Sequence, residues 1–288
     1  MADSPTSGFF VSDLHGQTER YRKLFEIIFK DPPSSVFIGG DFMPLSYGID
    51  AAFPRGFIHD FMIPELASMK KRMGENYPRI FLIMGNDDIR AEEPAVLEVQ
   101  NLGLLEYIHN RTVTVGGYSI YGYAFVPPTP FQLKDWERYD VSRFVDPGSI
   151  SPEEGRYSVP VSDREKKYST IKTDLENLTQ ERDLEKAIFL FHAPPYKTSL
   201  DRAALDNVKV DHVPLDVNTG SIAIRQFIET RQPLITLHGH IHESIRLTGR
   251  WLDKIGRTYL YGAAHDGPEL ALVSFDFEYP DLARRILI

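Results

Sequence analysis

The 288-residue chain has no cysteine and no hydrophobic run long enough to cross a bilayer. The missing cysteine excludes disulfides, cysteine nucleophiles and thiolate metal sites, so a metal ion here would have to be held by His, Asp, Asn or Glu. The first seven residues have neither a basic start nor an apolar core, so we expect no signal peptide and a soluble cytoplasmic protein.

Positive charge is also scarce in this sequence. The 32 Lys and Arg residues face 41 Asp and Glu residues, which gives a net charge of −9. A broad nucleic-acid surface needs an excess of basic residues, so we do not expect one. The chain has no repeat and no stretch of linker composition, and we therefore expect one domain over residues 1–288.

Short apolar runs, which are typical of buried strands, end repeatedly in polar residues that could bind a metal ion. The residues that follow these runs are Asp13 and His15, Asp41, Asn86, His192, and His240 and His242. Taken singly, each has an ordinary explanation as a helix cap or a turn residue. Their common position at the same end of each strand favours a site for two cations that share one carboxylate.

The histidine-rich stretch Leu237–Ser244 follows the apolar run Pro233–Leu237. Alternate side chains of an extended strand point the same way, so we expect His240 and His242 to lie on one face. The same alternation predicts that His238 shares that face.

The remaining pattern predicts a mixture of helices and strands. We expect helices at 17–30, 56–73, 94–101 and 220–230, a loop at 44–53, a hairpin over 111–123, a loop at 200–218, and a run of antiparallel strands at 244–251, 257–261 and 270–277. The composition of residues 127–186 indicates an insertion over the surface, with an exposed helix at 162–180. The aromatic and arginine residues of the insertion form either a substrate lid or a small satellite core.

The ordered series Asp-x-His, Gly-Asp, Gly-Asn, His and Gly-His-x-His resembles the calcineurin-like metallophosphoesterase superfamily, from about Phe9 to Ala263. Within it, the stretch from His192 to Glu243 is most similar to the Icc-related group of bacterial and archaeal predicted phosphoesterases. The resemblance implies an α/β fold, a four-layer α-β-β-α sandwich of two mixed sheets.

The resemblance also implies a ligand set for two divalent metal ions. Asp13, His15 and His242 would hold the first ion, and Asn86, His192 and His240 the second. Asp41 would bridge them. Manganese, iron, zinc and nickel all suit these ligands.

The implied activity is hydrolysis of a small phosphate ester by a hydroxide that bridges the two ions. The family motif is Gly-Asn-His-Asp or Gly-Asn-His-Glu, whereas this chain has Gly85-Asn86-Asp87-Asp88. An ionised Asp87 would be a poor proton donor and would repel a monoester dianion more than a diester monoanion, so we predict a phosphodiesterase. His238 and His265 are candidates to replace the missing acid.

Two other classes of function stay open. The first is a metallophosphoesterase-fold scaffold or regulatory ligand-binding protein with little turnover, which the loss of the motif histidine favours and the complete ligand set disfavours. The second is a phosphatase or a nuclease. The acidic charge argues against long nucleic acid, since phosphate-tracking grooves need clustered Lys and Arg.

Overall fold

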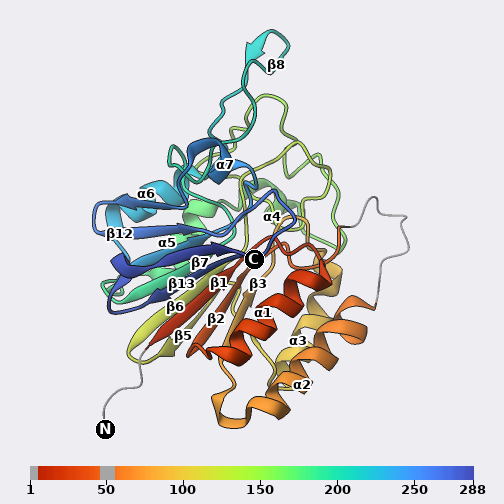
Figure 1. Cartoon of the computed structure of the whole chain (residues 1–288). Helices are drawn as coiled ribbons and strands as arrows, with labels where there is room; N and C mark the ends of the chain where they lie inside the picture. The colour runs from red at the N-terminus through yellow and green to blue at the C-terminus, as the bar shows by residue number, and fades with distance from the viewer. Residues whose placement is uncertain (1–5, 46–55) are drawn as a thin grey trace.

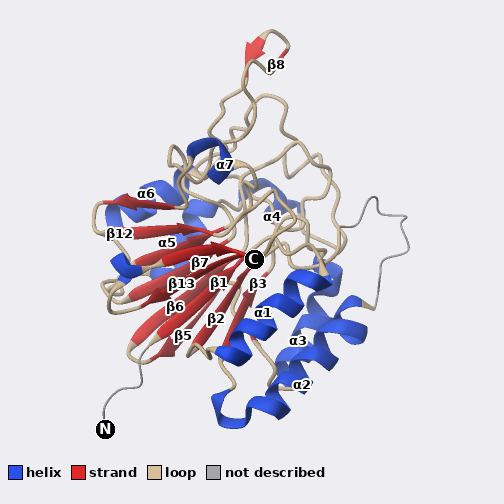
Figure 2. Cartoon of the chain, in the orientation of Figure 1, coloured by secondary structure: helices blue, strands red, loops and turns tan. Residues whose placement is uncertain are grey.

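The core of the fold is a pair of six-stranded mixed β-sheets with helices on their outer sides (Figures 1 and 2). The computed structural model describes residues 6–45 and 56–288. In this part of the chain, helices α1 to α3 lie beside one sheet and helices α5 and α6 beside the other. The arrangement confirms the α-β-β-α sandwich that the sequence predicts.

Sheet A has the strand order β14-β13-β1-β2-β3-β4. Its strands are β1 (Ser7–Val11), β2 (Ser35–Gly39), β3 (Arg79–Ile83), β4 (Glu106–Tyr107), β13 (Ala271–Asp276) and β14 (Arg284–Leu287). Strands β1 to β4 are parallel, and β13 is antiparallel to both β1 and β14. Because β1, β2 and β3 are parallel, the loops that follow them meet at one edge of the sheet.

Sheet B has the strand order β11-β12-β10-β7-β6-β5. Its strands are β5 (Arg111–Val115), β6 (Tyr118–Tyr123), β7 (Ala187–Phe191), β10 (Ile235–His238), β11 (Leu252–Ile255) and β12 (Thr258–Gly262). The predicted hairpin is confirmed by the antiparallel pair β5 and β6. Strand β10 is parallel to both β7 and β12, so the residues after β7 and β10 also meet at one edge.

Seven α-helices lie in the described ranges. They are α1 (Thr18–Lys30), α2 (Ile63–Met73), α3 (Glu93–Asn101), α4 (Asp163–Tyr168), α5 (Ile171–Thr179), α6 (Ile222–Arg231) and α7 (Ser244–Thr248). A π-helical segment, Phe57–Met62, precedes α2, so the predicted helix at 56–73 begins with wider turns. Helix α1 buries Tyr21, Leu24 and Ile28, as its spacing predicts. None of the helices in the described part is long and apolar enough to cross a membrane.

The predicted strand at 244–251 is wrong. Residues Ser244–Thr248 form helix α7, which Gly249 ends with a left-handed backbone, φ 72°. The strands predicted at 257–261 and 270–277 are confirmed as β12 and β13, and each has an antiparallel neighbour. They do not form one antiparallel run, because β12 also pairs in parallel with β10 and β13 joins sheet A. The choice of sheet and of neighbouring strand depends on tertiary pairing, which the local pattern does not encode.

The insertion differs from its prediction in its helix. The expected helix at 162–180 is divided at Thr170, whose side chain caps α5 by accepting a hydrogen bond from the Thr173 amide. Of the two alternatives for the aromatic residues of the insertion, the burial of Trp136 and Tyr139 favours a core over an exposed lid.

One of the two expected loops contains regular structure. The stretch 200–218 contains a short hairpin, β8 (Lys209–Val210) and β9 (Val213–Pro214), which projects at the top of Figure 1. Most of the expected loop at 44–53 falls outside the described residues.

Candidate metal centre

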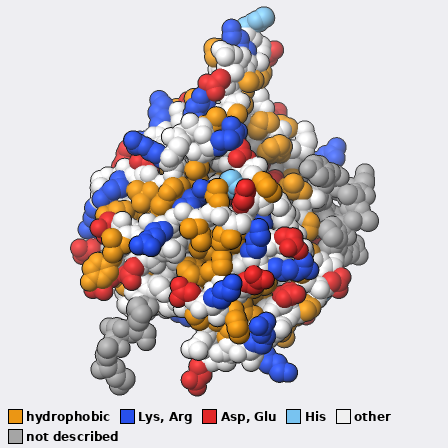
Figure 3. Space-filling view, viewed as in Figure 1, with side chains coloured by type: hydrophobic (Ala, Val, Ile, Leu, Met, Phe, Trp, Pro, Cys, Tyr) orange, Lys and Arg blue, Asp and Glu red, His pale blue; other side chains and the backbone are white. Residues whose placement is uncertain are grey.

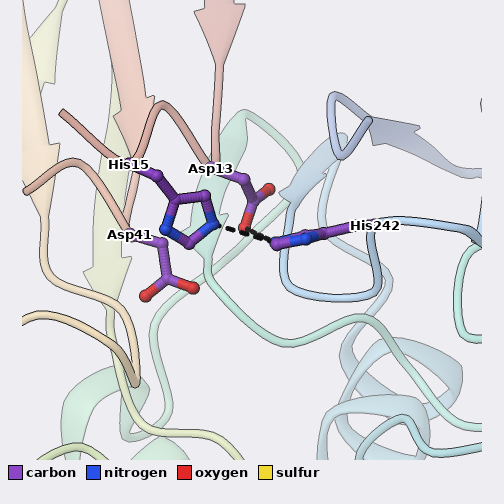
Figure 4. Close-up of side chains that lie close together, drawn as sticks. All are labelled: Asp13, His15, Asp41 and His242. Atoms are coloured by element: carbon purple, nitrogen blue, oxygen red, sulfur yellow. Dashed lines mark hydrogen bonds and ion pairs between the residues drawn. The ribbon is translucent and has the colours of Figure 1, made fainter. Parts of the chain in front are cut away.

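Side chains of the metal-ligand type converge in two groups that share one residue. The first group is Asp13, His15, Asp41 and His242, which Figure 4 shows, and the second is Asp41, His192 and His240. Within each group, one ligand atom per residue lies within 4.8 Å of the others. Asn86 joins the second group, because its Oδ1 is 3.1 Å from His192 Nε2. The structure therefore brings together all seven residues that the sequence suggests as ligands.

The backbone around the site is unusual. Four of these residues have a left-handed backbone: Asp13 (φ 56°), His15 (φ 46°), Asp41 (φ 49°) and His240 (φ 76°). Non-glycine residues adopt this region at a cost, so neighbouring structure must hold them there. Hydrogen bonds from the Asp13 amide to Gly40 O (3.1 Å) and from the His15 amide to Asp41 O (2.8 Å) lock the two loops together.

In the first group, two imidazoles and a carboxylate face one another. His15 Nε2 is 3.1 Å from His242 Nε2, and Asp13 Oδ1 is 3.4 Å from the same His242 atom. The His240 amide donates a 3.0 Å hydrogen bond to Asp13 Oδ1, which fixes that carboxylate. These atoms lie close enough together to serve as ligands of one cation.

The second group is centred on His192, which is fully buried. Its Nε2 is 3.1 Å from Asn86 Oδ1 and 3.2 Å from Asp41 Oδ2. Its Nδ1 donates a 2.7 Å hydrogen bond to the Gly39 carbonyl oxygen. In the neutral form of His192, that bond selects the tautomer whose Nε2 can bind a metal ion.

Protons compensate the carboxylate charge of this centre. Burial opposes protonation of His192, but the Asp41 and Asp13 carboxylates raise the pKa of His192 to about 10. Burial likewise opposes protonation of His242, but its hydrogen bond with Asp13 raises the pKa of His242 to about 9. For Asp13, burial is outweighed by His242, which keeps the Asp13 pKa below its usual range. The centre thus favours positive charge, which divalent cations would supply in place of protons.

Two glycines allow the loops to approach this closely. A Cβ at Gly85 would lie 2.7 Å from His192 Cε1, and a Cβ at Gly239 would lie 2.7 Å from Asp13 Oδ2. Real Cβ atoms do not tolerate such contacts. The glycines of the Gly-Asn and Gly-His motifs are therefore required by space.

The three candidate catalytic residues have different surroundings. His238 is buried; its Nδ1 lies 2.9 Å from Ala193 O and its Nε2 lies 2.8 Å from Thr236 Oγ1, so both ring nitrogens are engaged away from the metal-ligand groups. The alternation argument that placed it beside His240 and His242 is wrong, because strand β10 ends at His238 and His240 turns the chain. His265 lies 2.9 Å from Glu269 and belongs to neither group.

Asp87 lies at the edge of the first group. Its amide donates a 2.8 Å hydrogen bond to Asp41 Oδ1, and its Oδ2 is 4.0 Å from His15 Nδ1. Burial and the nearby Asp41 carboxylate raise the pKa of Asp87 to about 7.

Sequence reasoning missed two residues that support the centre. Asp88 is buried and accepts hydrogen bonds from the amides of Gly85 (2.9 Å) and Met43 (2.9 Å), so it ties the loop after β3 to the loop after β2. The sequence feature that could have identified Asp88 is its position at the end of the Gly-Asn motif. Arg20 is buried on α1 and donates a 2.8 Å hydrogen bond to the Asp13 carbonyl oxygen. The position of Arg20 beside the apolar face of a helix does not indicate that contact from the sequence.

Comparisons with known proteins agree with this geometry. The model of the calcineurin-like phosphoesterase family matches residues 9–244. Uncharacterized protein MJ1162 of Methanocaldococcus jannaschii is 38% identical over 79 residues, which are 27% of this chain and 30% of that protein. The match therefore spans less than a third of that relative's length.

Solved structures share the fold over nearly the whole chain. The protein TT1561 of Thermus thermophilus has a TM-score of 0.57 at 15% identity, covering 99% of both chains. A dimetal phosphatase from Danio rerio has a TM-score of 0.51 at 12% identity, covering 94% of this chain and 92% of that chain. At these identities the likeness concerns the fold alone.

Proposed function

Because the chain belongs to the calcineurin-like phosphoesterase family, we propose that it hydrolyses a small phosphate ester with two divalent metal ions and prefers diesters to monoesters. The observation that carries the proposal is the sharing of Asp41 by two groups of ligand side chains. A carboxylate with two oxygens can serve two ions at once, which is the arrangement of dinuclear hydrolytic centres.

The residues present fit such a pair of ions. Asp13, His15 and His242 would hold one ion, and Asn86, His192 and His240 the other, with Asp41 between them. When bound, two divalent ions lower the pKa of a water molecule and neutralise charge on the phosphoryl oxygens. Imidazole, carboxylate and amide ligands suit manganese, iron, zinc and nickel, and all four are candidates for this centre.

The protein's own contribution would be rigid placement of the ligands. The Gly39 carbonyl oxygen orients His192, and the His240 amide orients the Asp13 carboxylate. Such fixed groups need little rearrangement during the reaction, which is the main source of electrostatic catalysis.

The preference for diesters rests on Asp87, which stands where the family motif has a histidine. Cations bound nearby would favour the carboxylate form of Asp87, which then lacks a proton to give to a leaving group. A fixed negative charge repels a phosphomonoester dianion about twice as strongly as a diester monoanion at the same distance. A small cleft beside Asp87 is lined by Met43, Phe57, Ile58, Ile89 and Glu92.

Surface charge supports a small substrate over long nucleic acid. On the face seen in Figure 3, Lys and Arg side chains are interspersed with Asp and Glu side chains and form no continuous basic stripe. A protein that tracks a phosphate backbone needs clustered basic residues.

The test is to load the purified protein with Mn²⁺ and compare hydrolysis of an aryl phosphodiester with hydrolysis of the matching monoester. We expect faster cleavage of the diester and loss of activity on chelation. Faster cleavage of the monoester would refute the diester preference. Absence of turnover with both, while bound metal is measured, would instead favour a ligand-binding scaffold with this fold.

A further inference from the structure

The two ring nitrogens of His15 have very different surroundings. Nε2 faces His242 in the first ligand group, at 3.1 Å from His242 Nε2. Nδ1 is buried and has no hydrogen-bond partner within the described residues. His192 contrasts with it, since its Nδ1 donates to the Gly39 carbonyl oxygen at 2.7 Å. A buried ring nitrogen without a partner is costly and calls for an explanation.

The carboxylate that faces this nitrogen belongs to Asp87. Its Oδ2 is 4.0 Å from His15 Nδ1, about 1 Å more than a charge-assisted hydrogen bond. The other oxygen, Oδ1, accepts a 2.8 Å hydrogen bond from Asn86 Nδ2, and the Asp87 amide donates to Asp41 Oδ1 at 2.8 Å. These contacts fix the Asp87 backbone beside the ligand groups, and a hydrogen bond to His15 requires a side-chain rotation that shortens the Oδ2–Nδ1 distance by about 1 Å.

A histidine that binds a metal through one ring nitrogen usually donates the other N–H to a carboxylate or carbonyl group. That bond fixes the tautomer, orients the ring and makes the ligating nitrogen more basic. We propose that Asp87 accepts a hydrogen bond from His15 Nδ1 and thereby holds His15 Nε2 as a ligand of the first metal ion. Asp87 is then a positioning residue, and the motif position that departs from the family pattern supports the metal centre.

This inference rests on the proposed function, because it requires a metal ion at the first group. Its test uses Zn²⁺ alone as the probe and compares three variants of the full chain. Asp87→Ala removes both the acceptor and the charge, whereas Asp87→Asn removes the charge and retains an acceptor oxygen. Glu92→Gln is the matched control, since Glu92 lines the same cleft as Asp87 and its loss removes one negative charge nearby.

The first measurement is Zn²⁺ affinity by competition with a chelating dye. We expect Asp87→Ala to weaken binding at one of two sites by about 10–100-fold. Asp87→Asn should lose clearly less zinc affinity than Asp87→Ala. The zinc affinity of Glu92→Gln should stay within about threefold of that of the unchanged protein. Equal losses in Asp87→Ala and Asp87→Asn would mean that charge alone acts, and would overturn the inference.

The second measurement is NMR of the zinc-loaded protein with ¹⁵N-labelled histidine, with the His15 signals assigned by their loss in His15→Gln. We expect a slowly exchanging Nδ1–H proton on His15, which Asp87→Asn keeps and Asp87→Ala loses. A purely structural role of Asp87 would not change that proton selectively. Persistence of the same slowly exchanging proton in Asp87→Ala would overturn the inference.

Failure of the proposed function and failure of the Asp87 role give different results. If the unchanged protein binds no pair of zinc ions and hydrolyses neither ester with Mn²⁺, the proposed function fails together with the inference. If it binds the ions and hydrolyses ester, but Asp87→Ala keeps both its zinc affinity and the His15 proton, only the role of Asp87 fails.

Discussion

Arg20 Nη1 donates a 2.8 Å hydrogen bond to the backbone carbonyl oxygen of Asp13. Its Nη2 donates to the carbonyl oxygen of Gly267, which is 247 residues further along the chain. One buried guanidinium on α1 thus joins the loop after β1, which carries Asp13 and His15, to the loop after β12. The left-handed backbone of Asp13 is held in part by this contact.

We expect Arg20→Met to destabilise the metal-free protein by about 2–4 kcal/mol, because it removes hydrogen bonds from a charged donor and leaves two carbonyl groups without partners. Arg20→Lys should cost less, since one donor can be retained. Urea unfolding measures both changes. Arg22→Met is the control: Arg22 is exposed and forms an ion pair with the exposed Glu19, so its substitution should change stability by less than about 0.5 kcal/mol. Equal effects of the two methionine variants would contradict this role of Arg20.

Substitution of single ligands should separate the two metal sites. His242→Ala should lose the ion of the first group and keep the other, whereas His240→Ala should lose the ion of the second group. Asp41→Asn should weaken both, because Asp41 belongs to both groups. Elemental analysis after dialysis measures this as a fall from about two ions per chain to about one or fewer.

His59→Ala is the matched control for the ligand variants. His59 is exposed and pairs with Glu98 at 3.1 Å, outside both groups. The His59→Ala variant should retain the full metal content. It should also retain the full stabilisation by added metal, which is about 2.7 kcal/mol at a metal concentration one hundred times Kd. Loss of metal from this variant would show that the assay reports general damage.

Asp87→His restores the residue type of the family motif. We expect the ratio of monoester to diester hydrolysis to rise, because a repulsive carboxylate is replaced by a group that can be neutral or donate a proton. The ratio is the proper readout, since support of His15 by Asp87 affects both reactions alike. An unchanged ratio in steady-state assays with matched aryl substrates would refute the charge argument for diester preference.

Because the pKa of His109 is lowered, we expect the stability of the protein to depend on pH in the acidic range. Its Nδ1 accepts a 3.0 Å hydrogen bond from the Ala124 amide, and burial together with Arg138 lowers the pKa of His109 to about 3. The unfolded chain binds a proton near pH 6.5 and the folded chain does not. His109 therefore contributes its full stability above pH 6.5, and this contribution is lost as the pH falls from about 6.5 towards 3.

His109→Asn removes the titrating ring and places an amide oxygen close to the position of Nδ1. We expect its unfolding free energy to fall less steeply below about pH 6.5 than that of the unchanged protein, by up to about 1.4 kcal/mol per pH unit. Urea unfolding at several pH values measures both slopes. Parallel curves for the two proteins would show that His109 titrates alike in the folded and unfolded chains.

Much of the fold could be predicted because local patterns in the sequence determine it. The helix at 17–30 and the hairpin at 111–123 are confirmed by α1 and by β5 with β6, since apolar spacing and a Gly-Gly turn decide them. The segment predicted as a strand at 244–251 instead begins with helix α7, which follows a left-handed turn at His240 that the alternation of apolar residues does not record.

The candidate site could likewise be predicted only in part. The sequence by itself determined which polar residues follow the buried strands, and parallel pairing then brings strand ends together. Only the tertiary structure decided that His238 turns into the core while His240 and His242 face the carboxylates, and that Arg20 and Asp88 hold the loops. The physical reason is that ring orientation and left-handed backbone are set by hydrogen bonds between distant segments, which no local pattern of residues records.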